Sequence, residues 1–195
     1  MNTMNRLGRW VTLGMWLLGG VWGVQGQGNL ATSLDMNGNF LRIVGTQAAP
    51  FPGEAVQEGV VGQHTVLAYE HEMVVPTDAA GQPTGKLQHR TFRVVKLLNA
   101  STPRITQAMA VNELLKEVTM TMTMSDPQGG KPKLLMTYQL TNARIVQVRS
   151  WTPNNRYQAS RGYVPAEEIA FTYAKLTITH HPTGAVTVID RTSGN

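Results

Sequence analysis

The sequence contains no cysteine. This absence excludes a disulfide framework, a zinc site built on thiolates and a thiol nucleophile. Charged residues are also scarce, at 15%, whereas 42% of the 195 residues are hydrophobic, so the chain can bury a core. The length suggests one domain, alone or with a processed segment.

The common catalytic motifs are absent as well. The sequence has no Gly-rich phosphate loop and no His-Glu-x-x-His pattern, and Ser101 lacks the Gly-x-Ser-x-Gly context of a nucleophile. Glu167 and Glu168 open an alternating segment in which one side chain points inward and the next outward, and we interpret them as a solvated edge. We therefore expect no enzymatic activity and no cofactor.

The first residues predict an export signal. Arg6 and Arg9 precede an apolar run at residues 10–24, which at about 15 residues is short for a membrane span but typical of a signal peptide. A small-residue cleavage site ends at Gly26. We predict a signal peptide over residues 1–26, and the alternative is an uncleaved N-terminal anchor.

The charge balance argues against a nucleic-acid partner. Removing residues 1–26 takes away two arginines and no acid, so the 17 basic residues become 15 against 12 acidic residues, a net charge of +3. Nucleic-acid-binding domains usually carry a denser, clustered positive charge with aromatic residues among it. We expect no nucleic-acid partner, and no membrane contact after signal cleavage.

The remaining chain predicts a mainly β protein. Residues 27–38 lack periodicity and are expected to form a flexible tether before a domain over residues 39–195. Strands are expected at residues 39–45, 64–75, 92–98, 117–125, 133–148, 167–179 and 186–189. The strand at 133–148 is expected to kink near Asn142. Many strands with one helix indicate a compact β-barrel or sandwich.

The single predicted helix flanks this sheet structure and covers about residues 103–112. Thr102 is expected to cap it, and Pro103 fits the first helical position, where a missing N–H is not needed. Asn112 is expected to mark its end.

Two patterns could suggest a metal. The Met-x-Met-x-Met segment at residues 120–124 offers thioethers, which suit Cu(I). In an all-β domain such a strand more simply buries its methionine face in the core, and His180-His181 is typical of a polar turn. The other histidines lack ligand spacing: His64, His71 and His89. We expect no metal site and keep periplasmic copper handling as a third hypothesis.

The segment PTGKLQHRTFRVVKLLNASTPRITQAM, residues 83–109, resembles the hemolysin-coregulated protein (Hcp) family, the tube protein of type VI secretion systems. That family has a Pro-x-Gly-[Lys/Arg]-x-x-His loop, a strand that begins with Phe, and a Ser-Thr-Pro helix start. The matching positions are Pro83, Gly85, Lys86, His89, Phe92, Lys96, Ser101, Thr102 and Pro103. Residues 138–148 and 167–184 resemble later strands of the family in the same order.

The chain also departs from the family pattern. Thr91 stands where the family commonly has Pro, Asn99-Ala100 replaces a frequent Asp-Lys, and the usual acidic-Trp ending is absent. Tube proteins of this family are generally described as assembling in the cytoplasm without a signal peptide. We expect a secreted or periplasmic protein; with a translation start at Met36, the protein would instead be cytoplasmic before secretion.

The resemblance implies an Hcp-like β-barrel that closes into hexameric rings, which stack into a tube. The tube would carry effectors or be exported as one, and a trimeric spike protein and small effector cargo would be its partners. The loop at residues 76–88 would reach a neighbouring subunit. The residues assigned to this subunit interface are Pro83, Gly85, Lys86, His89 and Arg90. The alternative is an exported monomeric β-barrel binding module that has lost ring assembly.

Overall fold

The computed structural model describes residues 36–46, 50–126, 128, 130–152, 154, 156, 158, 162 and 164–191. These residues belong to one compact unit, Leu34–Asn195. The predicted signal peptide over residues 1–26 and most of the predicted tether lie outside the described residues. The last tether residues, 36–38, belong to the first strand, which therefore begins earlier than expected.

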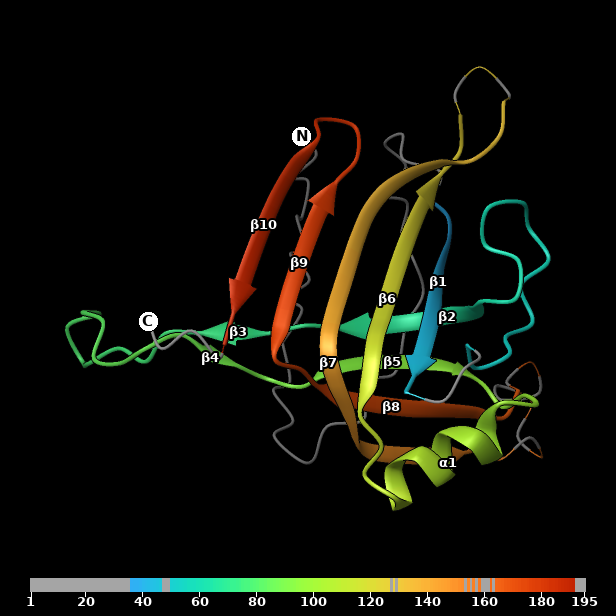
Figure 1. Cartoon of the computed structure of the whole chain (residues 1–195), viewed down its shortest axis with the longest axis horizontal. Helices are drawn as coiled ribbons and strands as arrows, with labels where there is room; N and C mark the ends of the chain where they lie inside the picture. The colour runs from blue at the N-terminus through green and yellow to red at the C-terminus, as the bar shows by residue number, and fades with distance from the viewer. Residues whose placement is uncertain are drawn as a thin grey trace, which may run out of the picture. The chain divides into compact units, whose positions relative to one another are not determined.

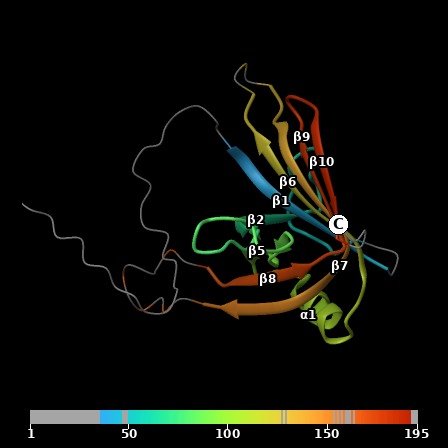
Figure 2. The same ribbon diagram turned by 90° about the vertical axis from the view of Figure 1, so that its left-hand side faces the viewer.

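An eight-stranded antiparallel sheet dominates the fold, and six of its strands close into a barrel (Figures 1 and 2). The barrel strands are β1 (Met36–Gly45), β2 (His64–Glu70), β5 (Phe92–Leu97), β6 (Leu115–Met124), β7 (Lys133–Trp151) and β8 (Ala166–Thr172). The order β1-β2-β5-β8-β7-β6 closes because β7 pairs with β8 in addition to β6. The predicted barrel is thus confirmed.

Two further strands, β9 (Lys175–His180) and β10 (Ala185–Asp190), extend the sheet beyond the barrel, and we call them the wing. The sheet can extend in this way because the long strand β7 pairs with strands of both the barrel and the wing. Its residues 136–141 pair with β9 and its residues 144–151 pair with β8. Asn142 lies at the change and has a φ of 52°, so the predicted kink is confirmed.

The change of partner also explains a wrong prediction. The segment at residues 167–179 alternates like one strand, but it is divided into β8 and β9 at Tyr173 and Ala174. β8 pairs with β5 and the second half of β7, whereas β9 pairs with the first half of β7. The chain must therefore turn between them.

The core fills the barrel and follows the strand period. Val118, Met120 and Met122 of β6 are buried and Met124 is half-buried, so the predicted burial of the methionine face is confirmed for Met120 and Met122. Thr121 and Thr123 are buried on the opposite face, because Phe40 lies beside Thr121 on the paired strand β1. Phe40 belongs to a second, smaller apolar cluster outside the barrel.

Helix α1 (Thr102–Ala110) packs against β7 through buried Ile105 and Ala108. Its N-cap is Ser101 and not the predicted Thr102, which forms the first helical residue. The helix ends before Asn112, whose positive φ of 51° follows the C-cap.

A short hairpin of β3 (Met73–Val74) and β4 (Gln88–His89) forms a separate two-stranded sheet. We call residues 73–89 the arm; Figure 1 shows it reaching away from the barrel. The predicted strand at residues 64–75 is thus interrupted after Glu70. Among the described residues, none of the helices has the length and apolarity needed to span a bilayer.

Candidate functional site

The arm is an ordered element, and most of it is accessible to solvent. Every residue from 77 to 88 is exposed. Its tip is held by Asp78, whose carboxylate accepts the backbone N–H groups of Ala80 and Gln82 at 2.9 and 2.8 Å. The arm therefore has a defined shape although it buries little surface within its own chain.

The residues predicted to form a subunit interface lie on or beside this arm. Pro83 makes an isolated bridge across the loop, Gly85 packs beside Pro76, and Lys86 is exposed. Arg90 follows the arm and lies 4.0 Å from the Glu72 carboxylate. The structure places Pro83, Gly85 and Lys86 on the arm and Arg90 directly after it. His89 ends the arm, but its ring turns to the barrel.

His71, just before the arm, and His89, at its end, both contact Tyr173, which lies between β8 and β9. His89 Nδ1 and His71 Nε2 each lie 2.9 Å from the hydroxyl of Tyr173. One hydroxyl can donate to one nitrogen and accept from an N–H of the other ring, so two neutral imidazoles satisfy this arrangement. We call the three residues the His–Tyr–His clamp.

The surroundings favour neutral rings in the clamp. Burial lowers the pKa of His71, and the nearby His89 lowers it further. Burial also lowers the pKa of His89, assisted by the charge of Arg191, which lies over the Tyr173 ring at 5.5 Å. Burial raises the pKa of Tyr173 to about 12, against the opposing effect of Arg191.

This clamp was missed by the sequence analysis, which found no ligand spacing for either histidine. Tyr173 lies 84 positions from His89 and 102 from His71, so only the fold brings them together. The guanidinium of Arg191 also disfavours a bound cation here. Among the described residues, no group of three or more His, Cys, Asp or Glu could hold a metal ion.

The wing offers a second accessible surface. β10 ends the sheet order and pairs with β9 alone among the described strands. Val186 and Val188 are each 57% exposed, and the strand contains no Lys or Pro. Charged or proline residues commonly protect such edges from pairing with other chains. β10 is therefore an open, uncharged pairing edge along most of its length.

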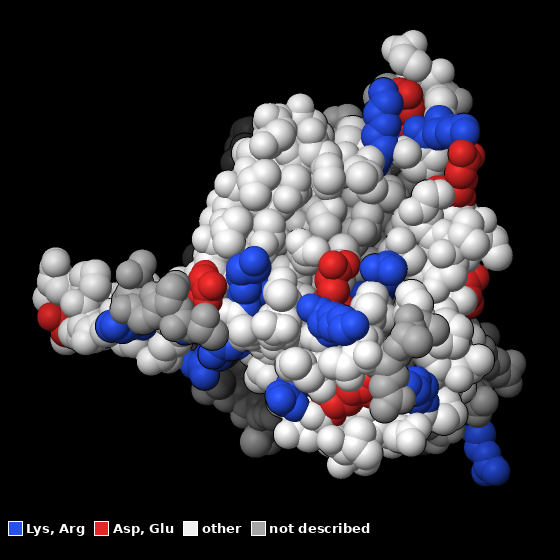
Figure 3. Space-filling view, in the orientation of Figure 1, with Lys and Arg blue, Asp and Glu red and all other residues white. Residues whose placement is uncertain are grey.

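The wing face beside this edge is rich in threonine. Two neighbouring rows of side chains cross β7, β9 and β10 in register. The first row is Thr137, Thr179 and Val186, and the second is Gln139, Thr177 and Val188. Figure 3 shows a broad surface without charged side chains over β9, β10 and the adjoining part of β7. Charged side chains lie below it, toward β8 and α1, and form a separate group at the upper right.

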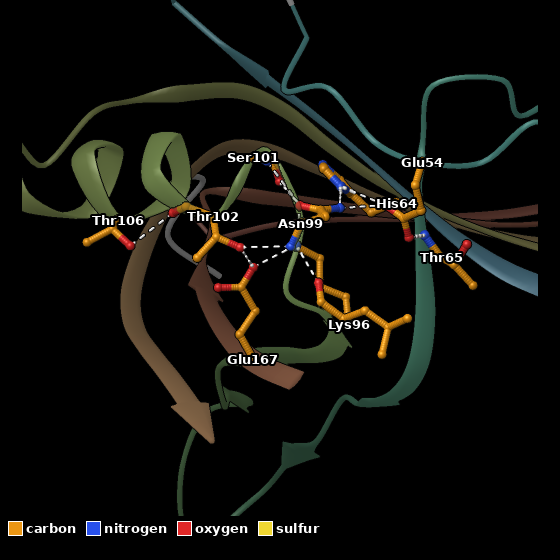
Figure 4. A network of polar contacts seen from close by, with 10 residues as sticks. Glu54, His64, Thr65, Lys96, Asn99, Ser101, Thr102, Thr106 and Glu167 are labelled. Carbon is orange, nitrogen blue, oxygen red and sulfur yellow. Dashed lines mark hydrogen bonds and ion pairs between the residues drawn. The ribbon is translucent and has the colours of Figure 1, made fainter. Parts of the chain in front are cut away.

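A buried polar network lies inside the joint between β5, α1 and β8 (Figure 4). Lys96 Nζ and Glu167 Oε1 are 2.6 Å apart, and both side chains are 0% exposed. Nζ also donates to the Leu97 carbonyl at 3.0 Å and to Asn99 Oδ1 at 2.9 Å. Thr102 Oγ1 donates to the same Glu167 oxygen at 2.9 Å.

The prediction of a solvated edge at Glu167 is therefore wrong. β8 is paired on both sides, with β5 and with β7, so the inward residue of the Glu pair is enclosed by the barrel. Glu168 faces the other way and binds Arg93 at 2.8 Å.

Asn99 is the centre of this network. Its Oδ1 accepts the backbone N–H of Ser101 at 3.0 Å and the Ser101 hydroxyl at 2.7 Å. Its Nδ2 donates to Glu54 Oε2 at 2.5 Å. Ser101 consequently makes no side-chain cap to the helix, because its hydroxyl is turned to Asn99. The network links the strand end, the helix start and the segment that carries Glu54.

His64 is the fully buried neighbour of these groups. Its Nδ1 lies 3.3 Å from Asn99 Nδ2, and its Nε2 has no hydrogen-bond partner among the described atoms. Burial and, next, the charge of Lys96 lower the pKa of His64 to about 4, against the opposing effect of Glu54. The ring is therefore neutral at physiological pH.

Known proteins resemble this chain over most of its length. The family described as "Type VI secretion system effector, Hcp" matches residues 40–180. The "Major exported protein" of Pseudomonas aeruginosa is 29% identical over 133 residues, which cover 68% of this chain and 77% of that protein.

Solved structures share the fold. The crystal structure of an Hcp protein is 22% identical and covers 80% of this chain and 99% of that one, with a TM-score of 0.73. An Hcp protein of enteroaggregative E. coli 042 is 21% identical and covers 79% of this chain and 98% of its own, with a TM-score of 0.70.

Proposed function

Because the chain belongs to the Hcp family of type VI secretion system effectors, we propose that it is a tube subunit that assembles into hexameric rings, which stack end to end. Proteins of this family form self-assembling rings in the type VI system. The single observation that carries the proposal for this chain is the arm, an ordered element whose residues 77–88 are exposed.

The arm fits a role in contacting a neighbouring copy. A chain rarely orders a long exposed loop without a partner or a function for it. The exposed apolar side chains at its base, Met73, Val75 and Leu87, would gain burial in such a contact. In this proposal Pro83, Gly85, Lys86 and Arg90 touch the neighbour, and His89 sets the angle of the arm through Tyr173.

The sheet supports a head-to-tail ring. One end of the run β10-β9-β7-β6-β1 is the open edge of β10. At the other end, β1 is paired with β2 only at Asn39, Phe40 and Leu41. A contact between two different edges generates a ring when the rotation closes. We propose that β10 of one copy lies along the start of β1 of the next.

The uncharged wing face supports a role in cargo passage. A wall of uncharged Thr and Gln side chains exerts no long-range electrostatic force on a charged cargo, so it neither holds nor repels it. We propose small effector proteins as cargo and a trimeric spike protein as the partner at the end of the tube. We also propose that residues 1–26 act as a signal peptide in export.

The second candidate is a monomeric exported binding module. The altered chain ending and the predicted signal peptide motivate it, since both set the chain apart from the family pattern. The two candidates share the barrel and differ in whether the arm meets a second copy.

Native mass spectrometry with negative-stain microscopy separates them. We expect the purified full chain to give a hexamer mass and ring images. A variant in which a Gly-Ser linker replaces residues 76–88 should remain folded by circular dichroism and be monomeric. A wild-type chain that stays monomeric at high concentration and low salt would refute the tube proposal and favour the binding module.

A further inference from the structure

We propose that Lys96 and Asn99 become joined by an intramolecular isopeptide bond, formed by the protein itself with Glu167 as the proton acceptor. The buried network holds a nucleophile, a base, an amide and donors for the amide oxygen within hydrogen-bonding distance of one another (Figure 4). This inference concerns the joint between β5 and α1 and does not depend on ring assembly.

The nucleophile and its base are already in contact. Lys96 Nζ lies 2.6 Å from Glu167 Oε1, and neither side chain is exposed. The other carboxylate oxygen of Glu167 is buried without a hydrogen-bond partner among the described atoms. Transfer of one proton from Nζ to Oε1, the carboxylate oxygen that it touches, leaves Lys96 as a neutral amine.

The amide that receives the attack is held beside Nζ. Asn99 Oδ1 lies 2.9 Å from Lys96 Nζ, which places the amide carbon close to the amine. The same oxygen accepts the Ser101 N–H at 3.0 Å and the Ser101 hydroxyl at 2.7 Å. Fixed donors at these distances stabilise the negative charge that develops on a carbonyl oxygen under attack.

The leaving group has a path to solvent. Asn99 Nδ2 points to Glu54, and the Glu54 side chain is 36% exposed. Ammonia released at this nitrogen therefore leaves on the side of the network nearest to water.

The atoms balance without an oxidant or a co-reactant. The Lys96 ammonium gives one proton to Glu167, and Nζ then attacks Cγ of Asn99. A second proton passes from Nζ to Nδ2, the Cγ–Nδ2 bond breaks, and ammonia departs. The products are an Nζ–Cγ amide that keeps the third proton and a protonated Glu167. The buried ion pair is thereby replaced by two neutral groups, which removes the cost of two buried charges.

Tryptic peptide mapping of the purified full-length protein tests this proposal. Trypsin does not cleave after a lysine whose side-chain amine is acylated, so the linked chain yields residues 94–104 as one peptide. We expect this peptide to be lighter than its sequence mass by one ammonia, with fragment ions that place the link between Lys96 and Asn99.

Two other results would overturn the proposal. The first is release of residues 97–104 at the mass expected from the sequence. The second is release of residues 97–104 lighter by one ammonia, which indicates a succinimide at Asn99 and not a link to Lys96. In either case Lys96 is free.

Matched variants test the assigned roles. Glu167→Gln should yield cleavage after Lys96, and Asn99→Ala should do the same, whereas Glu168→Gln should retain the lighter, uncut peptide. Circular dichroism of each variant establishes that the barrel has folded. A folded Glu167→Gln protein that still carries the link would refute the role of Glu167 as proton acceptor.

Discussion

At the scale of single residues, His64 links pH to the stability of the barrel. Its ring is fully buried in the described structure, and its pKa of about 4 lies below the usual 6.5. In the unfolded chain the ring takes up a proton as the pH falls below 6.5, whereas in the folded chain it stays neutral until about pH 4. The unfolded state thus binds more protons between these values, so the folded state loses stability as the pH falls.

We predict that the free energy of unfolding falls by about 3 kcal/mol through His64 between pH 6.5 and pH 4. His64→Leu should remove this part of the decrease, and His180→Asn, at an accessible position, should not. Urea unfolding at several pH values measures the effect. Equal pH dependence in wild type and His64→Leu would show that the buried ring does not titrate as described.

The residue scale also shows what sequence reasoning could have found. The side chains of Phe92, Val94 and Lys96 lie on the same, inward face of β5, and all three are buried. Strict alternation along this strand would have predicted an inward lysine, which requires a buried partner, but the sequence analysis did not draw this conclusion. The identity of that partner, Glu167, could not be predicted, because it depends on β8 pairing beside β5.

At the scale of elements, the clamp fixes the arm through a single hydroxyl. β3 and β4 are two residues each, so their ladder alone contributes little order. Tyr173 belongs to the buried core, and its hydroxyl contacts both His71 and His89, so it ties the two sides of the arm's base to the barrel.

We predict that Tyr173→Phe loosens the arm while the barrel stays folded. Each lost hydrogen bond is worth about 1 kcal/mol, so the free energy of unfolding should fall by less than about 2 kcal/mol. Amide hydrogen exchange in β3 and β4 should accelerate, with β5 and β6 unchanged. Tyr69→Phe, which removes a hydroxyl from the neighbouring aromatic cluster, is the control. Unchanged exchange in the arm would contradict the role of the clamp.

Elements were predictable where they depend on local pattern. The alternation of β6, the kink at Asn142 and the existence of α1 follow from period, turn chemistry and helix signals. The cap of α1 was predicted one residue late, because the Ser101 hydroxyl binds Asn99 rather than the helix backbone. The break at Tyr173 follows from a change of strand partner, which periodicity does not record.

At the scale of the whole molecule, the open edge of β10 should decide assembly. We predict that Val188→Lys leaves the barrel folded, since this side chain is 57% exposed, but reduces the assembled fraction more than tenfold. Lysine on an edge strand opposes the pairing of that strand with another chain. Val56→Lys, at an exposed position outside the wing, is the control. Sedimentation velocity at matched concentrations measures the assembled fraction of both variants. Normal assembly of Val188→Lys would show that β10 does not belong to the interface.

The proposed assembly surfaces were the least predictable part of this chain. The arm residues were assigned to an interface by resemblance to a family. The wing edge became visible only when the order of strands was known, because its short segment differs little in composition from a buried strand. An open edge is a property of the sheet and not of the strand that forms it.

The continuous course of β7 through wing and barrel has a mechanical consequence. Hydrogen bonds of antiparallel strands lie across the strand direction. A pull along β7 therefore loads its bonds to β6, β8 and β9 together, in shear, whereas a pull across it would open them one after another. In the proposed tube, a subunit built around one long shared strand would resist tearing between its two halves when the force runs along that strand.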